Sequence, residues 1–160
     1  MEHNSRKSSF PKYIKNPELQ LKTKNFILDN EARMHSFCHA NQKYHVMGVM
    51  LSAAGALDWF VTKILEENDF TTLLNNIDIY HKDSLVFLPY LSGERSPIND
   101  PFAKSVIYGA SLETNKSTML KAIIEGICLG LKDCYKTLED LNIKEYIDGT
   151  SFCQITNNLY

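Results

Sequence analysis

The chain has 160 residues, of which 44% are apolar and 22% charged, and its net charge at pH 7 is -2. This size and composition fit one globular domain with a hydrophobic core, exclude two full domains, and give no electrostatic basis for binding nucleic acid. No apolar run approaches the roughly 20 residues that span a membrane, and the first residues lack the apolar centre of a secretion signal, so we expect a cytoplasmic protein whose cysteines are thiols.

The first third of the chain changes character near residue 26. Residues 1–25 are rich in Lys, Asn, Ser and Pro and have no sustained period, so we predict a loose lead-in before a domain over 26–160. From Met47 to Leu65 the apolar residues recur at intervals of three and four, which predicts an amphipathic helix. Small side chains on this segment would let another backbone or a flat ligand come close.

The second half of the chain has three further signals. Residues 85–91 form a short apolar run, which predicts a strand weakened at Pro89, and the loop 92–101 that follows should be rich in turns. Residues 106–108 are another short strand candidate. The clearest element is a helix from about Ser117 to Leu141, the main core helix, with Asn142 as its left-handed stop.

Few residues of this chain suggest chemistry by themselves. His35, Cys38 and His39, with His45 nearby, could supply zinc ligands, but we favour histidines that are simply hydrogen-bonded, because no second pair of ligands is present. No Gly-x-Ser-x-Gly turn supports a hydrolase, and the seven glycines form no phosphate-binding cluster. The sequence therefore predicts neither a metal site nor a nucleophile.

The Gly-Glu-Arg loop contains charges of opposite sign close to two prolines. Glu94, Arg95 and Asp100 follow the predicted strand, and paired charges at this place could orient a ligand. The structural alternative, which we favour, is that Arg95 ties the loop down through hydrogen bonds to carboxylates and carbonyls. These three residues are therefore predicted as a structural or interface loop.

Three stretches, taken together and in this order, carry a family resemblance. The first comprises MHSFCHA at 34–40 and YHVMGVMLSAAGALDW at 44–59, the second is FLPYLSGERSPINDPFAK at 87–104, and the third is SVIYG at 105–109 with LKAIIEG at 120–126. They resemble the FGGY family of carbohydrate kinases, and most closely its D-xylulose kinases. The resemblance covers about residues 26–145.

The resemblance implies the fold and the class of reaction. It implies an α/β fold of the actin-like, ribonuclease-H-like type, present here as an incomplete second, nucleotide-side domain of a two-domain sugar kinase. In such kinases ATP, with Mg²⁺, lies between the domains and its γ-phosphate passes to a sugar hydroxyl. The sugar pocket and the catalytic aspartate belong to the first domain, so we expect no catalytic residue in this chain. The two glycine-rich loops expected near residues 16–24 and 144–155 are replaced by other sequence.

Part of the nucleotide site survives in the segment AGALDW at 54–59. By resemblance, a small residue and a polar residue four positions later contact the nucleotide, and these are Ala54 and Asp58. The carboxylate of Asp58 could accept hydrogen bonds from ribose hydroxyls. The alternative is that Asp58 is only a surface carboxylate and Trp59 a core aromatic residue.

Two functions from different classes follow from these observations. The first is a C-terminal part of an ATP-dependent D-xylulose kinase that is inactive alone, whose intact relatives use ATP and a pentulose sugar. The second is a non-catalytic interaction module that pairs with itself as a homodimer or with a separate, complementing kinase half.

Overall fold

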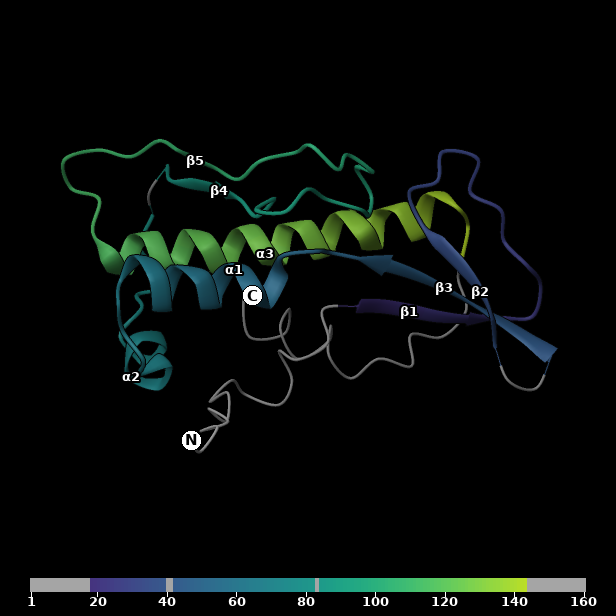
Figure 1. Cartoon of the computed structure of the whole chain (residues 1–160), viewed down its shortest axis with the longest axis horizontal. Coiled ribbons are helices and arrows are strands. Elements are labelled where there is room, and N and C mark those ends of the chain that lie inside the picture. Colours follow the sequence, from purple (N-terminus) through teal and green to yellow (C-terminus); the bar gives the residue numbers. More distant parts are fainter. Residues whose placement is uncertain (1–17, 40–41, 83, 144–160) are drawn as a thin grey trace, which may run out of the picture.

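The computed structural model describes residues 18–39, 42–82 and 84–143 (Figure 1). Within them, an antiparallel sheet has the strand order β1–β3–β2, and a second sheet pairs β4 with β5. The strands are β1 (Glu18–Thr23), β2 (His35–His39), β3 (Lys43–Val49), β4 (Val86–Leu88) and β5 (Val106–Tyr108). The helices are α1 (Ala53–Trp59), the π-helix η3 (Phe60–Ile64), α2 (Phe70–Asn75) and α3 (Lys116–Asp140).

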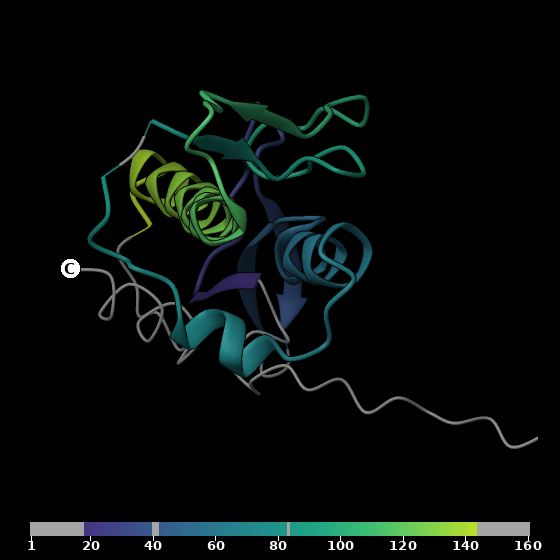
Figure 2. The same ribbon diagram turned by 90° about the vertical axis from the view of Figure 1, so that its left-hand side faces the viewer.

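The long helix α3 lies between two layers. The β4–β5 pair covers one side of α3, and α1 with the three-stranded sheet lies on the other (Figures 1 and 2). The helix begins at a capping box, in which the Asn115 side chain accepts from the Thr118 N–H and the Thr118 hydroxyl accepts from the Asn115 N–H. It ends before Asn142, whose φ of 56° is left-handed.

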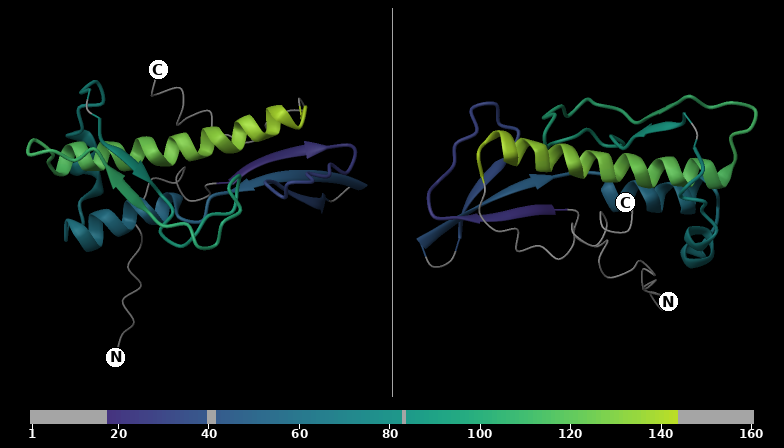
Figure 3. Two further views of the ribbon diagram at one scale, coloured as in Figure 1. Left: turned by 90° about the horizontal axis from the view of Figure 1, so that it is seen from above. Right: turned by 180° about the vertical axis from the view of Figure 1, so that it is seen from behind.

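The two ends of α3 belong to two hydrophobic clusters. The N-terminal half packs in the first cluster with α1, η3 and β4, and the C-terminal half packs in the second with β3. Figure 3 shows the same division, with α1 beside one half of α3 and the three-stranded sheet beside the other. The first cluster contains Ala56, Leu57, Phe60, Val61, Phe70, Leu85, Phe87, Leu120, Ala122 and Ile123, and the second contains Met34, Val46, Met50, Ala53, Leu131, Cys134, Leu138 and Ile143.

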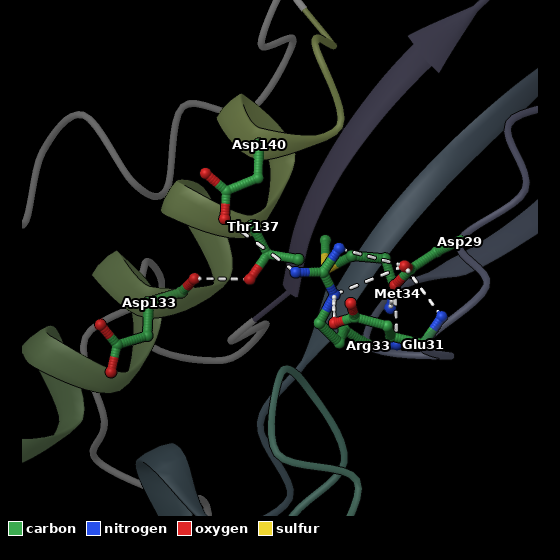
Figure 4. A network of polar contacts seen from close by, with 7 residues as sticks. All are labelled: Asp29, Glu31, Arg33, Met34, Asp133, Thr137 and Asp140. Carbon is green, nitrogen blue, oxygen red and sulfur yellow. Dashed lines mark hydrogen bonds and ion pairs between the residues drawn. The ribbon is translucent and has the colours of Figure 1, made fainter.

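A polar network fixes the loop before β2 against the end of α3 (Figure 4). The Asp29 carboxylate accepts hydrogen bonds from the backbone N–H groups of Arg33 and Met34, and it pairs with the Arg33 guanidinium at 3.2 Å. Burial acts to raise the pKa of Asp29, but the hydrogen bonds from Arg33 and its neighbours outweigh burial and hold this pKa below its ordinary value. Arg33 also reaches Asp140 at 4.0 Å, which links the loop to α3.

The predicted elements are confirmed in the second half of the chain. Strand β5 covers residues 106–108, helix α3 runs within one residue of the predicted bounds, and β4 ends before Pro89. The stop at Asn142 is confirmed by its positive φ.

The first half of the chain differs from the prediction. The predicted helix from Met47 is wrong at its start, because residues 47–49 belong to β3 and the helical segment begins at Ala53. Ordered structure also begins before residue 26, since β1 pairs with β3 from Glu18 to Thr23. In both places the pairing of distant strands overrides the local pattern.

Candidate functional site

The outer face of α1 carries the residues predicted to contact a nucleotide. The helix buries Ala53, Ala56 and Leu57 against α3 and the core, which turns the remaining positions outward. Asp58 is exposed, Ala54 is half-buried, and a methyl group added to Gly55 would meet no atom within 4 Å. The structure thus places Ala54 and Asp58 one turn apart on an open surface that has no side chain at Gly55.

This surface can receive a flat ligand. Small residues allow close approach to the backbone, and a carboxylate one turn further along can accept hydrogen bonds from hydroxyl groups. The helix continues directly into η3, where the Leu65 N–H donates to the Phe60 carbonyl at 2.9 Å. Such π-turns often occur at functional sites.

The Gly-Glu-Arg loop lies against the beginning of this helical segment. Glu94 is buried, with 2% of its surface exposed, and its Oε1 accepts from the Leu51 N–H at 3.0 Å and from the Arg95 N–H at 2.8 Å. The Glu94 N–H donates to the Asp100 carbonyl oxygen at 2.8 Å. The loop is therefore tied to the chain just before α1.

The side chains of Arg95 and Asp100 do not make this tie. Arg95 is exposed, and the exposed Asp100 accepts from the Phe102 N–H within its own loop. The expectation that Arg95 fastens the loop is therefore corrected, because the buried carboxyl group of Glu94 does so. The structure brings Glu94 to the start of α1 and leaves Arg95 and Asp100 at the surface.

Three serines of this junction were not predicted from the sequence. The hydroxyls of Ser52 and Ser92 are hydrogen-bonded at 2.9 Å, and the Ser96 N–H donates to the Val49 carbonyl at 3.1 Å. A lone polar residue at position 52 within an apolar run was the available signal. Its partner is 40 residues away, so the pairing is not visible in the sequence.

The histidine candidates form an aromatic ladder on β2 and β3. Phe37 stacks on His45 with ring centroids 5.2 Å apart, and His39 meets His45 edge-on at 5.7 Å. Because successive residues of a strand face opposite sides, Cys38 lies on the other face from His39. Among the described residues no group of three or more His, Cys, Asp or Glu is arranged to hold a metal ion.

The same absence of a carboxylate cluster means that the described residues give little support to a Mg²⁺ site. Of the two positions where the resemblance places glycine-rich loops, residues 18–23 of the first form strand β1, and 144–155 lie outside the described residues. In the described part of the chain no helix is long and apolar enough to cross a membrane.

Known carbohydrate kinases resemble this chain in sequence. Residues 19–151 match the model of the FGGY family of carbohydrate kinases, C-terminal domain. The xylulose kinase of Escherichia coli is 37% identical over 122 residues, which are 74% of this chain and 25% of that protein. The xylulose kinase of Klebsiella pneumoniae is 38% identical over 111 residues, or 68% of this chain and 23% of that protein.

Solved structures show the same likeness in three dimensions. A protein from Brucella ovis described as a xyloylose kinase superposes with a TM-score of 0.71 at 33% identity, over 81% of this chain and 27% of that one. A ligand-bound xylulose kinase from Lactobacillus acidophilus gives 0.65 at 26% identity, over 76% and 25%. The chain spans about a quarter of the length of these relatives. Its α/β arrangement is part of their actin-like ATPase fold.

Proposed function

The chain belongs to the FGGY family of carbohydrate kinases, within its C-terminal domain, and on this premise we propose that it is the nucleotide-side part of an ATP-dependent D-xylulose kinase. In this proposal the outer face of α1 receives the nucleotide, with Ala54 leaving room and Asp58 accepting hydrogen bonds from the ribose. The proposal assigns the sugar pocket and the catalytic base to another part of the kinase, so the chain alone should not transfer phosphate to the sugar.

One observation carries the proposal. The segment that resembles the xylulose kinases, residues 44–59, is also the segment that builds the open face of α1, with nothing within 4 Å of a methyl group added to Gly55. An exposed carboxylate beside that opening is the group that ribose recognition needs. Sequence likeness and geometry therefore point to the same residues.

The partners follow from the same premise. The xylulose kinases of Escherichia coli and Klebsiella pneumoniae are about four times as long as the matched region. We therefore include in the proposal a complementing kinase half that holds the pentulose and the catalytic base, Mg²⁺ that accompanies ATP, and a location in the cytoplasm, where ATP is available.

Nucleotide binding is tested by the thermal stability of the purified chain. A ligand present at ten times its Kd stabilises the folded state by about 1.4 kcal/mol, which for a chain of this size raises Tm by about 3–5 °C. Asp58→Ala removes one hydrogen bond to a charged acceptor and should weaken ATP binding about tenfold, reducing the rise in Tm to about 1 °C. Differential scanning fluorimetry across an ATP titration measures both shifts.

The control is Glu139→Ala, which removes an exposed carboxylate near the end of α3 and should leave the ATP-dependent shift intact. Equal shifts in the native and Asp58→Ala chains would refute the role of Asp58. ADP release with D-xylulose and Mg·ATP tests the second half of the proposal: sugar-dependent turnover by the chain alone would contradict it.

A further inference from the structure

We propose that Glu94 is a positioning residue, whose buried carboxyl group holds the turn between β3 and α1 and thereby sets the place of α1. The inference deepens the proposed function, because α1 carries Ala54 and Asp58. The positioning itself requires no nucleotide, so it can be tested separately.

The beginning of α1 lacks the usual local support. Its N-cap residue, Ser52, makes no side-chain capping hydrogen bond, and the first turn contains no acidic residue. The Ser52 hydroxyl is used on Ser92 instead. Because the first N–H groups of a helix have no partner within the helix, its start depends on groups from elsewhere in the chain.

Glu94 supplies a non-local partner at this point. Its Oε1 accepts from the Leu51 N–H, directly before the N-cap, although the two residues are 43 positions apart. The same oxygen accepts from the Arg95 N–H, so the carboxyl group cannot turn away without losing two hydrogen bonds. Ser96 adds a bond to Val49, and together these contacts fix the loop and the turn to each other.

In the described part of the chain no positive charge acts on Glu94. Its Oε2 has no hydrogen-bond partner in the described part of the chain, and the titratable groups that interact with Glu94 are Tyr90 and Cys134, with Asp133 acting on both. Burial raises the pKa of Glu94 above its ordinary value, although the N–H groups of Leu51 and Arg95 act in the opposite direction. Burial likewise raises the pKa of Cys134, to about 12. Among the described residues Glu94 therefore has no ion-pair partner, and the hydrogen bonds from Leu51 and Arg95 are its defined contacts.

A simpler role would be to stabilise only the loop 92–101. The two roles differ in what changes when Glu94 is altered. If Glu94 stabilises only the loop, its substitution should speed hydrogen exchange only within residues 92–101. If Glu94 positions α1, its substitution should also speed exchange at Leu51 and in the first turn of α1. The only tryptophan of the chain, Trp59, lies on α1 and reports on this helix by fluorescence.

The experiment compares four variants of the full chain by hydrogen exchange with mass spectrometry and by acrylamide quenching of Trp59. Glu94→Ala removes the acceptor and should raise exchange at Leu51 and in the first turn of α1 about tenfold, with stronger quenching of Trp59. Glu94→Gln keeps an acceptor oxygen at the same reach and should behave as the native chain. Glu94→Asp keeps the acid but is one methylene shorter, so it should resemble Glu94→Ala. Arg95→Ala, at the exposed neighbour, is the matched control and should change nothing.

The outcomes separate the two roles and the two proposals. Unchanged exchange at Leu51 in folded Glu94→Ala, or faster exchange confined to residues 92–101, would overturn the inference. If Glu94→Ala does not fold, the comparison of Glu94→Gln with Glu94→Asp decides, and equal protection of α1 in these two variants would overturn it. If α1 responds as expected but ATP shifts the Tm of no chain, the positioning role stands and the proposed function fails.

Discussion

Burial gives two carboxyl groups of this chain different chemistry. Asp58 is exposed on the outer face of α1 and is available to a ligand, whereas Glu94 is 2% exposed and its Oε1 is occupied by two backbone N–H groups. The sequence alone predicts both as polar residues near recognisable motifs. Their separate roles follow from where the fold places each side chain.

The raised pKa of Glu94 makes a specific prediction for stability against pH. Because the folded chain holds this proton more tightly than the unfolded chain, the contribution is fully present below the ordinary pKa of 4.5 and is lost as pH rises through the folded-state pKa. Glu94→Gln does not titrate there. The unfolding free energy of the native chain relative to Glu94→Gln should therefore fall as pH rises above about 4.5, as measured by urea unfolding at each pH.

Arg95→Ala serves as the reference, since it retains Glu94 and should follow the pH profile of the native chain. A difference between the native and Glu94→Gln chains that stays constant across this range, or grows in favour of the native chain, would show that burial does not raise the pKa of Glu94.

Among the secondary-structure elements, α3 organises the fold because it contacts both layers. Gly126 lies where the helix meets β4, and a methyl group there would overlap the carbonyl oxygen of Phe87. The Met50 side chain lies against Gly130, one turn further along the helix. The atom that a side chain at Gly126 would meet belongs to the backbone of β4, so it cannot move aside as the end of a flexible side chain could.

Two glycine substitutions should therefore have opposite effects. Gly126→Ala should lower the unfolding free energy by about 1–3 kcal/mol, because the added methyl group forces α3 and β4 apart. Gly55→Ala, in the middle of α1 with open space around it, should raise it by about 0.5–1 kcal/mol, because alanine favours the helix. Thermal and urea unfolding measure both changes. A stabilised Gly126→Ala chain would contradict the close contact between α3 and β4.

The elements also show where sequence reasoning succeeds. Helix α3 is predictable because its 25 residues repeat one helical period and Asn142 follows shortly after its end. The predicted helix starts too early, at Met47. The apolar residues of β3 and α1 together keep the spacing of three and four that is typical of a helix, so this spacing does not show where the strand ends. Only pairing with β1 and β2 makes residues 47–49 a strand.

At the scale of the whole molecule, the β4–β5 sheet exposes an apolar surface. Pairs Val86–Tyr108 and Leu88–Val106 lie across the β4–β5 sheet, and all four side chains are exposed, whereas Phe87 between them is buried against α3. Apolar patches of this kind promote association, and a two-stranded sheet has no further strand to cover them. We call these four residues the outer β4–β5 face.

We expect the chain to associate with itself through this face as its concentration rises. Light scattering after size exclusion should give a mass above the monomer at high micromolar concentration, and Leu88→Lys with Val106→Lys should restore the monomer mass. The matched control is Lys104→Ala in the adjacent exposed loop. A monomer at every concentration in the native chain would contradict the prediction.

The sequence alone identified the family, helix α3 and strand β5, because contiguous motifs and local periods carry those signals. It also predicted Ala54 and Asp58 as nucleotide contacts, which stays a prediction. The sequence also disfavoured a zinc site at His35, Cys38 and His39, because no second pair of ligands accompanies them. The tertiary structure decided that Ala54 and Asp58 share an open face, that Glu94 rather than Arg95 fastens the loop, and that residues 47–49 form a strand. The physical reason is distance along the chain: a carboxyl group that meets a backbone N–H 43 residues away, and strands that pair across a sheet, leave no local pattern.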